Sequence, residues 1–284
     1  MNPRAGIQAG TQAGKAAAFR ELHARSRPFL IPNPWDRGSA MILESMGFEA
    51  LATTSLGLAN VLGVRDMTLQ QVLDNCREIC EATRLPVNAD LENGFADEPR
   101  EAAKAIRLAC EAGAVGGSIE DSTGDTQNPI YDFNLAVERV RAAVEVARSL
   151  PVPFMLTARA ENFLHGIKDM DDTIRRLQAF EAAGADVLYA PGLYGLEQMR
   201  TVTSALRKPF NAVMGFADPN ITLEQLGQAG VRRVSIGGGL NRVALKAFMD
   251  AARQMREGNF GFITSMAPMV EVRGAFERPS KPPA

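Results

Sequence analysis

Three segments of this 284-residue sequence place charged side chains directly after a short apolar run: VNADLENG, SIEDSTG and LTARAEN. The first two contribute carboxylates, including Asp90 and Glu120, and the third contributes the guanidinium of Arg159. Hard divalent cations such as Mg2+ prefer carboxylate oxygens and water, and a planar guanidinium binds a carboxylate or phosphate at two points. The three segments therefore predict an enzyme that holds a cation and an anionic substrate in one site.

The predicted metal ligands are Asp90 and Glu120. Asn88, acting through water, and Glu92 are further candidates in the same segment. A structural alternative is that these acids only pair with Lys or Arg at the rim of the fold. Arg159 has a similar alternative, a salt bridge to a nearby acid, and that role is compatible with substrate binding.

Two further segments could bind an anion through their backbone. Thr54, Ser55 and Leu56 follow an apolar run in ATTSLGLAN, where small residues let N–H groups approach an anion, although a plain turn explains them equally well. Three glycines at 237–239 follow a later run. Many barrels hold a phosphate at such a position, which gives a second interpretation, an enzyme for a phosphorylated metabolite.

The elements that must position these residues follow a regular rhythm along the chain. Eight short apolar runs alternate with segments of helical periodicity, and four of the helices end in a glycine that suits a left-handed cap. Alternating strands and helices predict a parallel sheet, and eight units of about 30 residues fit a (β/α)8 barrel. An open doubly wound sheet is the alternative, but IPNPWDRGS after the first run is no dinucleotide fingerprint. The runs are Phe29–Ile31, Ala50–Thr53, Val87–Ala89, Gly117–Ile119, Phe154–Thr157, Val187–Tyr189, Phe210–Val213 and Arg233–Ile236.

The same rhythm sets the expected domain organisation. Residues 1–12 are predicted to be a disordered tail, residues 13–257 the barrel, and residues 258–284 a C-terminal helical extension and tail. The extension contains apolar residues in FGFITSMAPMVEVRGAFERP, so we expect an extra helix that packs on the barrel or on a neighbouring subunit. In a barrel the loops after the strands form the active face, so Asp90, Glu120 and Arg159 should converge there.

Composition narrows the classes of partner. A net charge of −2 gives no broad basic field, which argues against nucleic-acid binding. No apolar run reaches the ~20 residues that cross a bilayer, and the N-terminal segment lacks the apolar core of a secretory signal. Three cysteines without a metal-type pattern are typical of a reducing compartment. We therefore expect a cytoplasmic protein without a membrane partner.

Several motifs, in this order, make the chain from about residue 29 to 240 resemble the isocitrate lyase/phosphoenolpyruvate mutase superfamily. They are GFEALATTSLGLA, GVRDMT, LPVNADLENGFAD, GGSIEDSTG, LTARAEN and FNAVMG. The resemblance implies that Thr54, Ser55 and Leu56 hold the substrate carboxylate and that Arg159 and Asn211 bind substrate. It implies that Asp90 belongs to an acidic metal motif read as D-x-D-x-G-[YF]-G and that Glu120 belongs to the metal shell. It also implies that Asp66 is the acid of the second loop.

The resemblance also implies the chemistry. Members are Mg2+-dependent barrels, with Mn2+ as a substitute, that make or break C–C or P–C bonds beside a 2-oxo acid through an enolate-like intermediate. Many are tetramers whose terminal helix swaps between subunits, so we expect a homo-oligomer, a tetramer or a dimer, and the swap would account for the C-terminal extension.

Departures from the superfamily pattern limit the assignment. Asn88 stands where the first acid of the metal motif is expected, with one extra residue in the motif. The K-[KR]-C-G-H loop that supplies the catalytic cysteine of isocitrate and methylisocitrate lyases is replaced by STGDTQNPIYDF, in which Asn128 is the one match to phosphonate enzymes. VLYAPG lacks the glutamate that many lyases carry.

The sequence thus predicts a Mg2+-dependent lyase or decarboxylase that cleaves a C–C bond of a small 2-oxo or 2-hydroxy dicarboxylate. Arg159 and Asp66 are the predicted catalytic residues. The first alternative is P–C chemistry of the phosphonopyruvate hydrolase or phosphonomutase type. The second is a degenerate barrel without catalytic activity.

Overall fold

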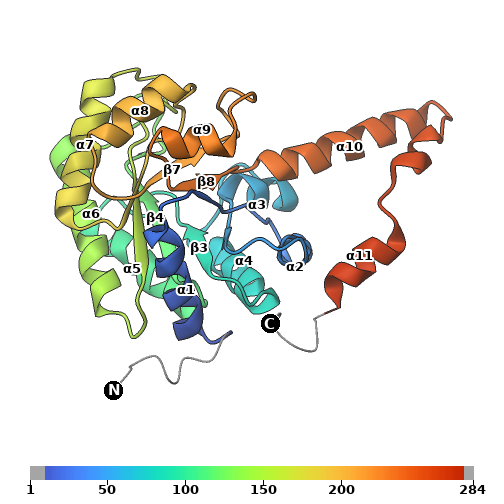
Figure 1. Cartoon of the computed structure of the whole chain (residues 1–284), viewed down its shortest axis with the longest axis horizontal. Coiled ribbons are helices and arrows are strands. Elements are labelled where there is room, and N and C mark those ends of the chain that lie inside the picture. Colours follow the sequence, from blue (N-terminus) through green and yellow to red (C-terminus); the bar gives the residue numbers. More distant parts are fainter. Residues whose placement is uncertain (1–9, 278–284) are drawn as a thin grey trace.

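The computed structural model describes residues 10–277, within which eight parallel strands alternate with helices around one axis (Figure 1). Most of the tail predicted over residues 1–12, and the end of the 258–284 extension, lie outside the described residues. The strands are β1 (Phe29–Leu30), β2 (Leu51–Ala52), β3 (Val87–Asp90), β4 (Gly116–Glu120), β5 (Met155–Arg159), β6 (Val187–Tyr189), β7 (Phe210–Val213) and β8 (Arg233–Ser235).

The order of the strands confirms the predicted (β/α)8 barrel. Every strand from β2 to β8 pairs with its neighbours in the sequence, and β1 pairs with β8, so the sheet order is β1-β8-β7-β6-β5-β4-β3-β2. The backbone N–H of Ala52 donates to the carbonyl of Pro32 at 3.1 Å, which links the ends of β1 and β2. The sheet therefore curls until its two edge strands meet.

Helices cover the outside of the sheet, and their ends follow from local sequence. Asp36, Thr68 and Thr222 each open a helix with a reciprocal capping box. The four predicted helix-ending glycines, at positions 47, 113, 184 and 230, all have positive φ. The helices are α1 (Gln12–Ala24), α2 (Arg37–Ser45), α3 (Ser55–Leu62), α4 (Leu69–Ala82), α5 (Pro99–Glu111), α6 (Phe133–Ser149), α7 (Met170–Ala183), α8 (Leu196–Ser204), α9 (Leu223–Gln228), α10 (Gly239–Arg256), the 3-10 turn η1 (Gly261–Ser265) and α11 (Met269–Phe276).

Two apolar clusters hold the barrel together. The larger one lies between the sheet and the helices from α2 to α9. The smaller one joins Phe19 and Leu22 of α1 to Phe29 and Ile31 around β1. The helix α1 thereby packs against the beginnings of the strands and leaves their C-terminal ends open for a site.

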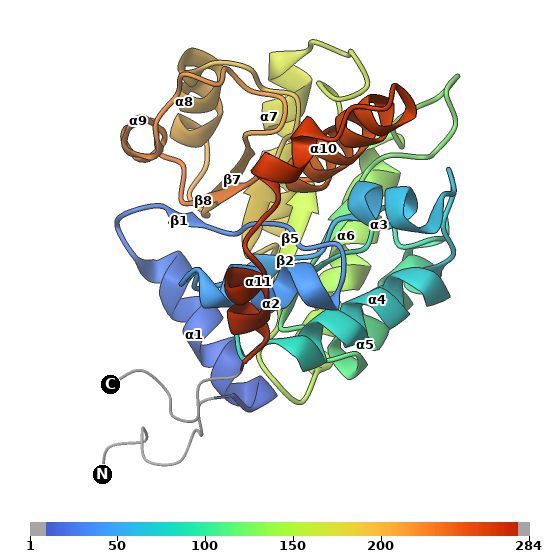
Figure 2. The same cartoon turned by 90° about the vertical axis from the view of Figure 1, so that its right-hand side faces the viewer.

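The C-terminal segment leaves the barrel and returns to it. Figure 1 shows α10 extending away from the sheet, and Figure 2 shows α11 lying beside α2, with which it is in contact. This confirms the extra helical segment. It does not bury its apolar residues: Asn241 is the one buried residue of α10, and α11 has none. Phe248 is 70% exposed and Val270 81% exposed.

Candidate active site

Arg159 stands at the centre of a cluster of acids at the C-terminal ends of β3, β4 and β5. Its Nη1 lies 3.0 Å from Oδ1 of Asp90 and 2.9 Å from Oε2 of Glu120, and its Nε lies 2.8 Å from Oε1 of Glu161. The guanidinium carbon also lies 5.0 Å from the ring centre of Tyr189 on β6. Asp90, Glu92, Glu120, Arg159 and Glu161 are called the rim below.

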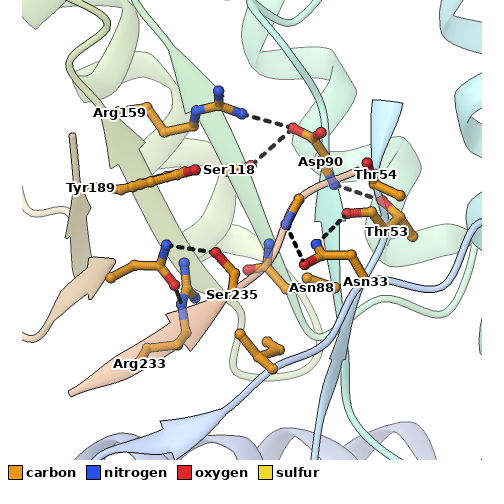
Figure 3. A pocket seen from close by; sticks show the side chains of 14 residues that line it. Asn33, Thr53, Thr54, Asn88, Asp90, Ser118, Arg159, Tyr189, Arg233 and Ser235 are labelled. Carbon is orange, nitrogen blue, oxygen red and sulfur yellow. Dashed lines mark hydrogen bonds and ion pairs between the residues drawn. The ribbon is translucent and has the colours of Figure 1, made fainter. Parts of the chain in front are cut away.

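The carboxylate of Asp90 is held in place by the segments around it. Its Oδ2 accepts a hydrogen bond from the N–H of Ser55 at 3.0 Å, at the first turn of α3, where the positive end of the helix favours an anion. Its own N–H donates to the Thr53 hydroxyl at 2.8 Å. Figure 3 shows Asp90 between Arg159 and Ser118 on one side and Thr53 on the other. Asp90 is therefore oriented before any ligand arrives.

The rim carries more negative than positive charge. Burial, together with the charge of Asp90, raises the pKa of Glu92 to about 7. Burial also raises the pKa of Glu120 well above its usual range, although Arg159 opposes this. For Arg159, burial by itself lowers the pKa, but Glu120, Glu161 and Asp90 outweigh it and raise the pKa well above its usual value. One guanidinium therefore faces an excess of carboxylates, and a further cation would relieve it.

This donor set fits a magnesium ion that keeps most of its water. The described residues contain no preformed group of three or more side chains in ligand geometry. Mg2+ is commonly held by one or two carboxylates, with waters and substrate oxygens completing its shell. Asp90 and Glu120 share one donor nitrogen, so they already converge on the place of a positive charge, and Glu92 adds a third carboxylate nearby.

The backbone at Glu92 supports a changed alignment of the acidic motif. Glu92 and Phe95 have φ values of 47° and 60°, a region that residues other than glycine rarely adopt and that often occurs at functional sites. Asp90, Glu92, Gly94 and Phe95 fit D-x-D-x-G-[YF] without an extra residue, if glutamate replaces the second aspartate. Asn88 is two residues earlier on β3 and is not needed as the first acid.

A second layer of polar side chains lies below the rim inside the barrel. Arg233 on β8 donates from Nε to Oδ1 of Asn211 at 2.8 Å and from Nη2 to the Thr157 hydroxyl at 3.0 Å. Asn211 in turn donates to the Ser235 hydroxyl at 3.0 Å. Thr157 precedes Arg159 by two residues on β5, which places this layer one inward position deeper. Asn88, Thr157, Asn211, Arg233 and Ser235 are called the floor below.

Rim and floor enclose one pocket (Figure 3). Residues from all eight strand regions line it, but three rim residues, Glu92, Glu120 and Glu161, and Thr157 of the floor are not among them. The lining residues are Ile31, Asn33, Ala52, Thr53, Thr54, Asn88, Asp90, Ser118, Arg159, Tyr189, Asn211, Arg233, Ser235 and Gly237.

The other predicted residues lie in different positions around this pocket. Thr54 lines it and caps α3 by accepting from the N–H of Gly57 at 3.2 Å. Leu56 is 45% exposed beside Gly238. Asp66 lies on the exposed loop before α4, where its charge acts on Glu92. Asn211 is buried at the floor, and both of its polar atoms bond to protein.

The loop after β4 differs from the lyase loop as the sequence indicated. Ser122 and Ile130 form an isolated antiparallel bridge, and the segment between them is mostly exposed. The Ser122 hydroxyl lies 3.1 Å from Nε2 of His165, which follows β5. Below it, Asp121 accepts from the N–H of Glu161 and pairs with Arg176 at 3.0 Å. This buried ion pair fixes the backbone that carries Glu161.

Sequence reasoning missed six polar residues that line the pocket: Asn33, Thr53, Ser118, Tyr189, Arg233 and Ser235. A signal for them was present: inward-facing residues recur at every second position of a barrel strand. Pairs of polar residues follow that spacing on three strands, with the deeper residue first in each pair: Asn88 and Asp90, Ser118 and Glu120, and Thr157 and Arg159. An arginine within the apolar run of β8 was a further signal.

Comparison with known proteins decides the family. The phosphoenolpyruvate phosphomutase family matches residues 19–256 of the chain. The chain belongs to this family, and so to the isocitrate lyase/phosphoenolpyruvate mutase superfamily. An uncharacterised Mycobacterium tuberculosis protein is 30% identical to it over 246 residues, which is 85% of this chain and 90% of the other. The Escherichia coli 2-methylisocitrate lyase is 29% identical over 75% of each chain, and an Ectopseudomonas mendocina oxaloacetate decarboxylase is 28% identical over 84% of each.

Solved structures of family members share the fold. A Burkholderia cenocepacia protein provisionally assigned as a lyase or mutase is 51% identical, with a TM-score of 0.92 over 94% of this chain and 97% of the other. An oxaloacetate acetylhydrolase in complex with its product oxalate is 25% identical, with a TM-score of 0.83 over 95% of each chain. The predicted superfamily is thus confirmed, and its curated members include lyases and decarboxylases of small acids.

Proposed function

We propose that the protein is a Mg2+-dependent carbon–carbon lyase or decarboxylase acting on a small 2-oxo or 2-hydroxy dicarboxylate through an enolate-like intermediate. The observation that carries the proposal is the convergence of Asp90 and Glu120 on one nitrogen of Arg159 above a polar pocket. The family relationship to 2-methylisocitrate lyase and oxaloacetate decarboxylase supports the reaction class.

In this proposal the rim carboxylates hold the cation and Arg159 holds the substrate. Asp90, Glu92 and Glu120 are the metal-binding set, with Mn2+ as a substitute ion. When bound, the cation supplies Lewis-acid stabilisation of the negative charge that develops as the bond breaks. Arg159 balances the remaining acids and binds a substrate oxygen once the cation takes over part of the charge of Asp90 and Glu120.

The remaining predicted residues have supporting roles in this mechanism. The backbone N–H of Ser55 orients Asp90, and the Thr54–Leu56 segment opens α3 toward the pocket. Asp66, on the loop before α4, is placed to act on protons near Glu92. Asn211 acts through Arg233, whose Nε it accepts from, rather than by direct contact with the substrate.

A panel of 2-oxo and 2-hydroxy diacids, with phosphonopyruvate included, tests the reaction class. Proton and phosphorus NMR with and without Mg2+ should show metal-dependent C–C cleavage or decarboxylation, at least 1,000-fold slower in Asp90→Asn. Asp74→Asn, on the exposed face of α4, is the matched control and should keep full turnover. Phosphate release from phosphonopyruvate would move the protein to P–C chemistry. Silence across the panel together with no Mg2+ binding would establish a non-catalytic barrel.

We also propose that the active form is a homo-oligomer that buries α10 and α11. Val243, Phe248 and Val270 are each at least 69% exposed, more apolar surface than a monomer usually leaves in contact with water. Light scattering should give a dimer or tetramer, and Phe248→Glu should shift it toward monomer. A wild-type monomer at micromolar concentration would contradict this.

A cytoplasmic location completes the proposal. All three cysteines are buried free thiols, as expected of a protein in a reducing compartment. No helix among residues 10–277 combines the length and apolarity needed to cross a membrane.

A further inference from the structure

Arg233 is a buried cation that forms no ion pair among the described residues. It is 3% exposed, and its two bonded nitrogens donate only to the neutral oxygens of Asn211 and Thr157. Its third nitrogen, Nη1, is buried and has no hydrogen-bond partner. Burial lowers the pKa of Arg233 to about 9. Burying an unpaired charge is costly, so a protein rarely keeps one without a use for it.

Three other arginines of the barrel show how a guanidinium inside this protein is usually paired. Arg159 contacts three carboxylates, and Arg176 contacts Asp121 and Asp172. Arg139 donates to three backbone carbonyls and stacks on a tyrosine ring. Nε of Arg139 is also buried without a partner, but Arg139 does not line the pocket, and Arg159 lines the pocket with its charge met by three carboxylates. Arg233 is the one of these four arginines that both lines the pocket and keeps a buried nitrogen without a partner.

A second unsatisfied group lines the same pocket. Oδ1 of Asn88 is buried without a partner, and Asn88 is 3% exposed. Figure 3 shows Arg233 reaching from β8 into the group of floor side chains, beside Ser235. An ionised carboxylate would satisfy Nη1 of Arg233, whereas Oδ1 of Asn88 requires a donor such as a hydroxyl group or a water molecule.

We propose that Arg233 determines substrate specificity by binding a second carboxylate at the floor of the pocket. The proposal rests on the proposed function for the position of the first acid group, at the rim. Thr157, which Arg233 contacts, is two residues below Arg159 on β5, so Thr157 and Arg159 are about 7 Å apart along the strand at ~3.3 Å per residue. The two arginines therefore act at different depths of the pocket, as the two acid groups of one small molecule require.

Charge explains why the second acid belongs at the floor. The rim holds four carboxylates against one arginine, so with all four ionised a divalent cation still leaves an excess of negative charge, and the first substrate acid binds there only through the cation and Arg159. A second substrate acid at that level would be repelled by the uncompensated carboxylates. The floor has the opposite property, since Arg233 is its one charged side chain and the others are amides and hydroxyls. A diacid therefore fits both levels once a cation occupies the rim.

The competing explanation is that Arg233 is only structural, because its hydrogen bonds join β5, β7 and β8. A structural role would change stability and affinity for every ligand alike. A binding role would change the preference for diacids over monoacids of equal length. The ratio of the two affinities separates the explanations, and it does not require turnover.

Isothermal titration in the presence of Mg2+ measures this ratio. The probes are 2-hydroxysuccinate against 2-hydroxybutyrate, and 2-hydroxyglutarate against 2-hydroxypentanoate, in which a methyl group replaces the second carboxylate. We expect Arg233→Met to weaken diacid binding by about 10- to 100-fold, the range for loss of a charged hydrogen bond, while monoacid binding changes less than threefold. Arg233→Lys should restore part of the preference. Arg232→Met, on the neighbouring half-buried residue, is the control and should keep it in full.

The outcomes separate this proposal from the proposed function. Loss of the diacid preference in Arg233→Met, with the fold intact by circular dichroism, establishes the floor subsite even if no substrate in the panel turns over. Equal weakening of diacids and monoacids, or an unchanged ratio, overturns it even if Asp90→Asn abolishes turnover. If Arg233→Met fails to fold, Arg233→Lys and Asn211→Ser provide the same ratio in milder form, and an unchanged ratio in both overturns it.

Discussion

At the rim of the pocket one guanidinium contacts three carboxylates, whereas at the floor, two residues deeper, one guanidinium contacts none. Both arginines are buried inside the same barrel, so burial alone does not determine how a charge is compensated. At the rim the protein supplies a negative excess that invites a cation. At the floor it supplies a positive charge that invites an anion. The difference teaches that two arginines in one barrel can be compensated in opposite ways, one by the protein's own carboxylates and the other by neutral oxygens alone.

The largest effect should come from removing the rim cation. Arg159→Met leaves Asp90, Glu120 and Glu161 crowded without a positive partner, in a place where Arg159 is 12% exposed. Breaking a buried ion pair from one side costs about 3–5 kcal/mol, and the substrate contact is lost as well. Urea unfolding should show that loss, and turnover should fall at least 1,000-fold. Arg175→Met, an exposed ion pair on α7, should cost under about 1 kcal/mol.

Adding Mg2+ gives this prediction a second readout. If the rim acids bind a cation, Mg2+ should recover part of the stability lost in Arg159→Met, because it replaces the missing charge. An Arg159→Met protein as stable as wild type, with or without Mg2+, would show that the rim acids are not short of positive charge.

A pH titration tests the negative excess more gently. The pKa of Glu92 is raised to about 7 from a usual 4.5, mainly by burial and then by Asp90. Its folded-state pKa lies above its unfolded-state pKa, so its contribution to stability is fully present below pH 4.5 and is lost as the pH rises through 7. Allowing for solvent screening at this half-buried group, the loss is about 2 kcal/mol.

Glu92→Gln should remove this pH dependence. The melting temperature of the wild type, relative to that of the variant, should fall between pH 4.5 and pH 7 in metal-free buffer. Glu138→Gln, exposed on α6, is the matched control and should follow the wild type. Because Mg2+ competes with the proton on Glu92, the affinity for Mg2+ should rise over the same range. If the melting temperatures of Glu92→Gln and wild type changed in parallel with pH, Glu92 would not contribute to the excess of negative charge at the rim.

The strand pattern made the barrel predictable from sequence. All eight predicted runs coincide with strands to within one or two residues at most ends, because parallel strands covered by helices read as short apolar runs. The glycines that end helices were equally visible, since positive φ restricts the residue type. The rim was found for a related reason: charged residues stand out where an apolar run ends.

The floor was not predictable in the same way. The sequence makes Asn88 a candidate ligand acting through water because it lies two residues from Asp90. On β3 that spacing puts Asn88 one layer deeper than Asp90, and the metal role of Asn88 stays a prediction. Arg233 belongs to an apolar run, and nothing in VRRVS tells which of its two arginines faces inward. Only the contacts of Arg233 with Asn211 and Thr157, from strands far apart in sequence, establish its place.

Asn88→Asp tests directly whether Asn88 belongs to the metal site or to the floor. If Asn88 stood at the first acid of the metal motif, aspartate would complete the motif and strengthen Mg2+ binding. At the floor, its new carboxylate would instead offer Arg233 a counter-charge and repel the second substrate acid. We expect diacid affinity to fall about tenfold, with Mg2+ affinity unchanged within twofold. Asn88→Ala separates the effect of losing the amide from the effect of gaining a charge. Stronger Mg2+ binding in Asn88→Asp would show that position 88 corresponds to the first acid of the metal motif.

The smallest effect should come from Tyr189, whose ring lies against Arg159 at 5.0 Å between the two levels. Its ring can stabilise the guanidinium, whereas its hydroxyl cannot act as a base near neutral pH, because burial raises its pKa well above the usual value. Tyr189→Phe keeps the ring and should change unfolding free energy by under about 0.5 kcal/mol and leave the pH profile of turnover unchanged, whereas Tyr189→Leu should cost about 1 kcal/mol. A pH profile altered in Tyr189→Phe would make the hydroxyl a participant in proton transfer.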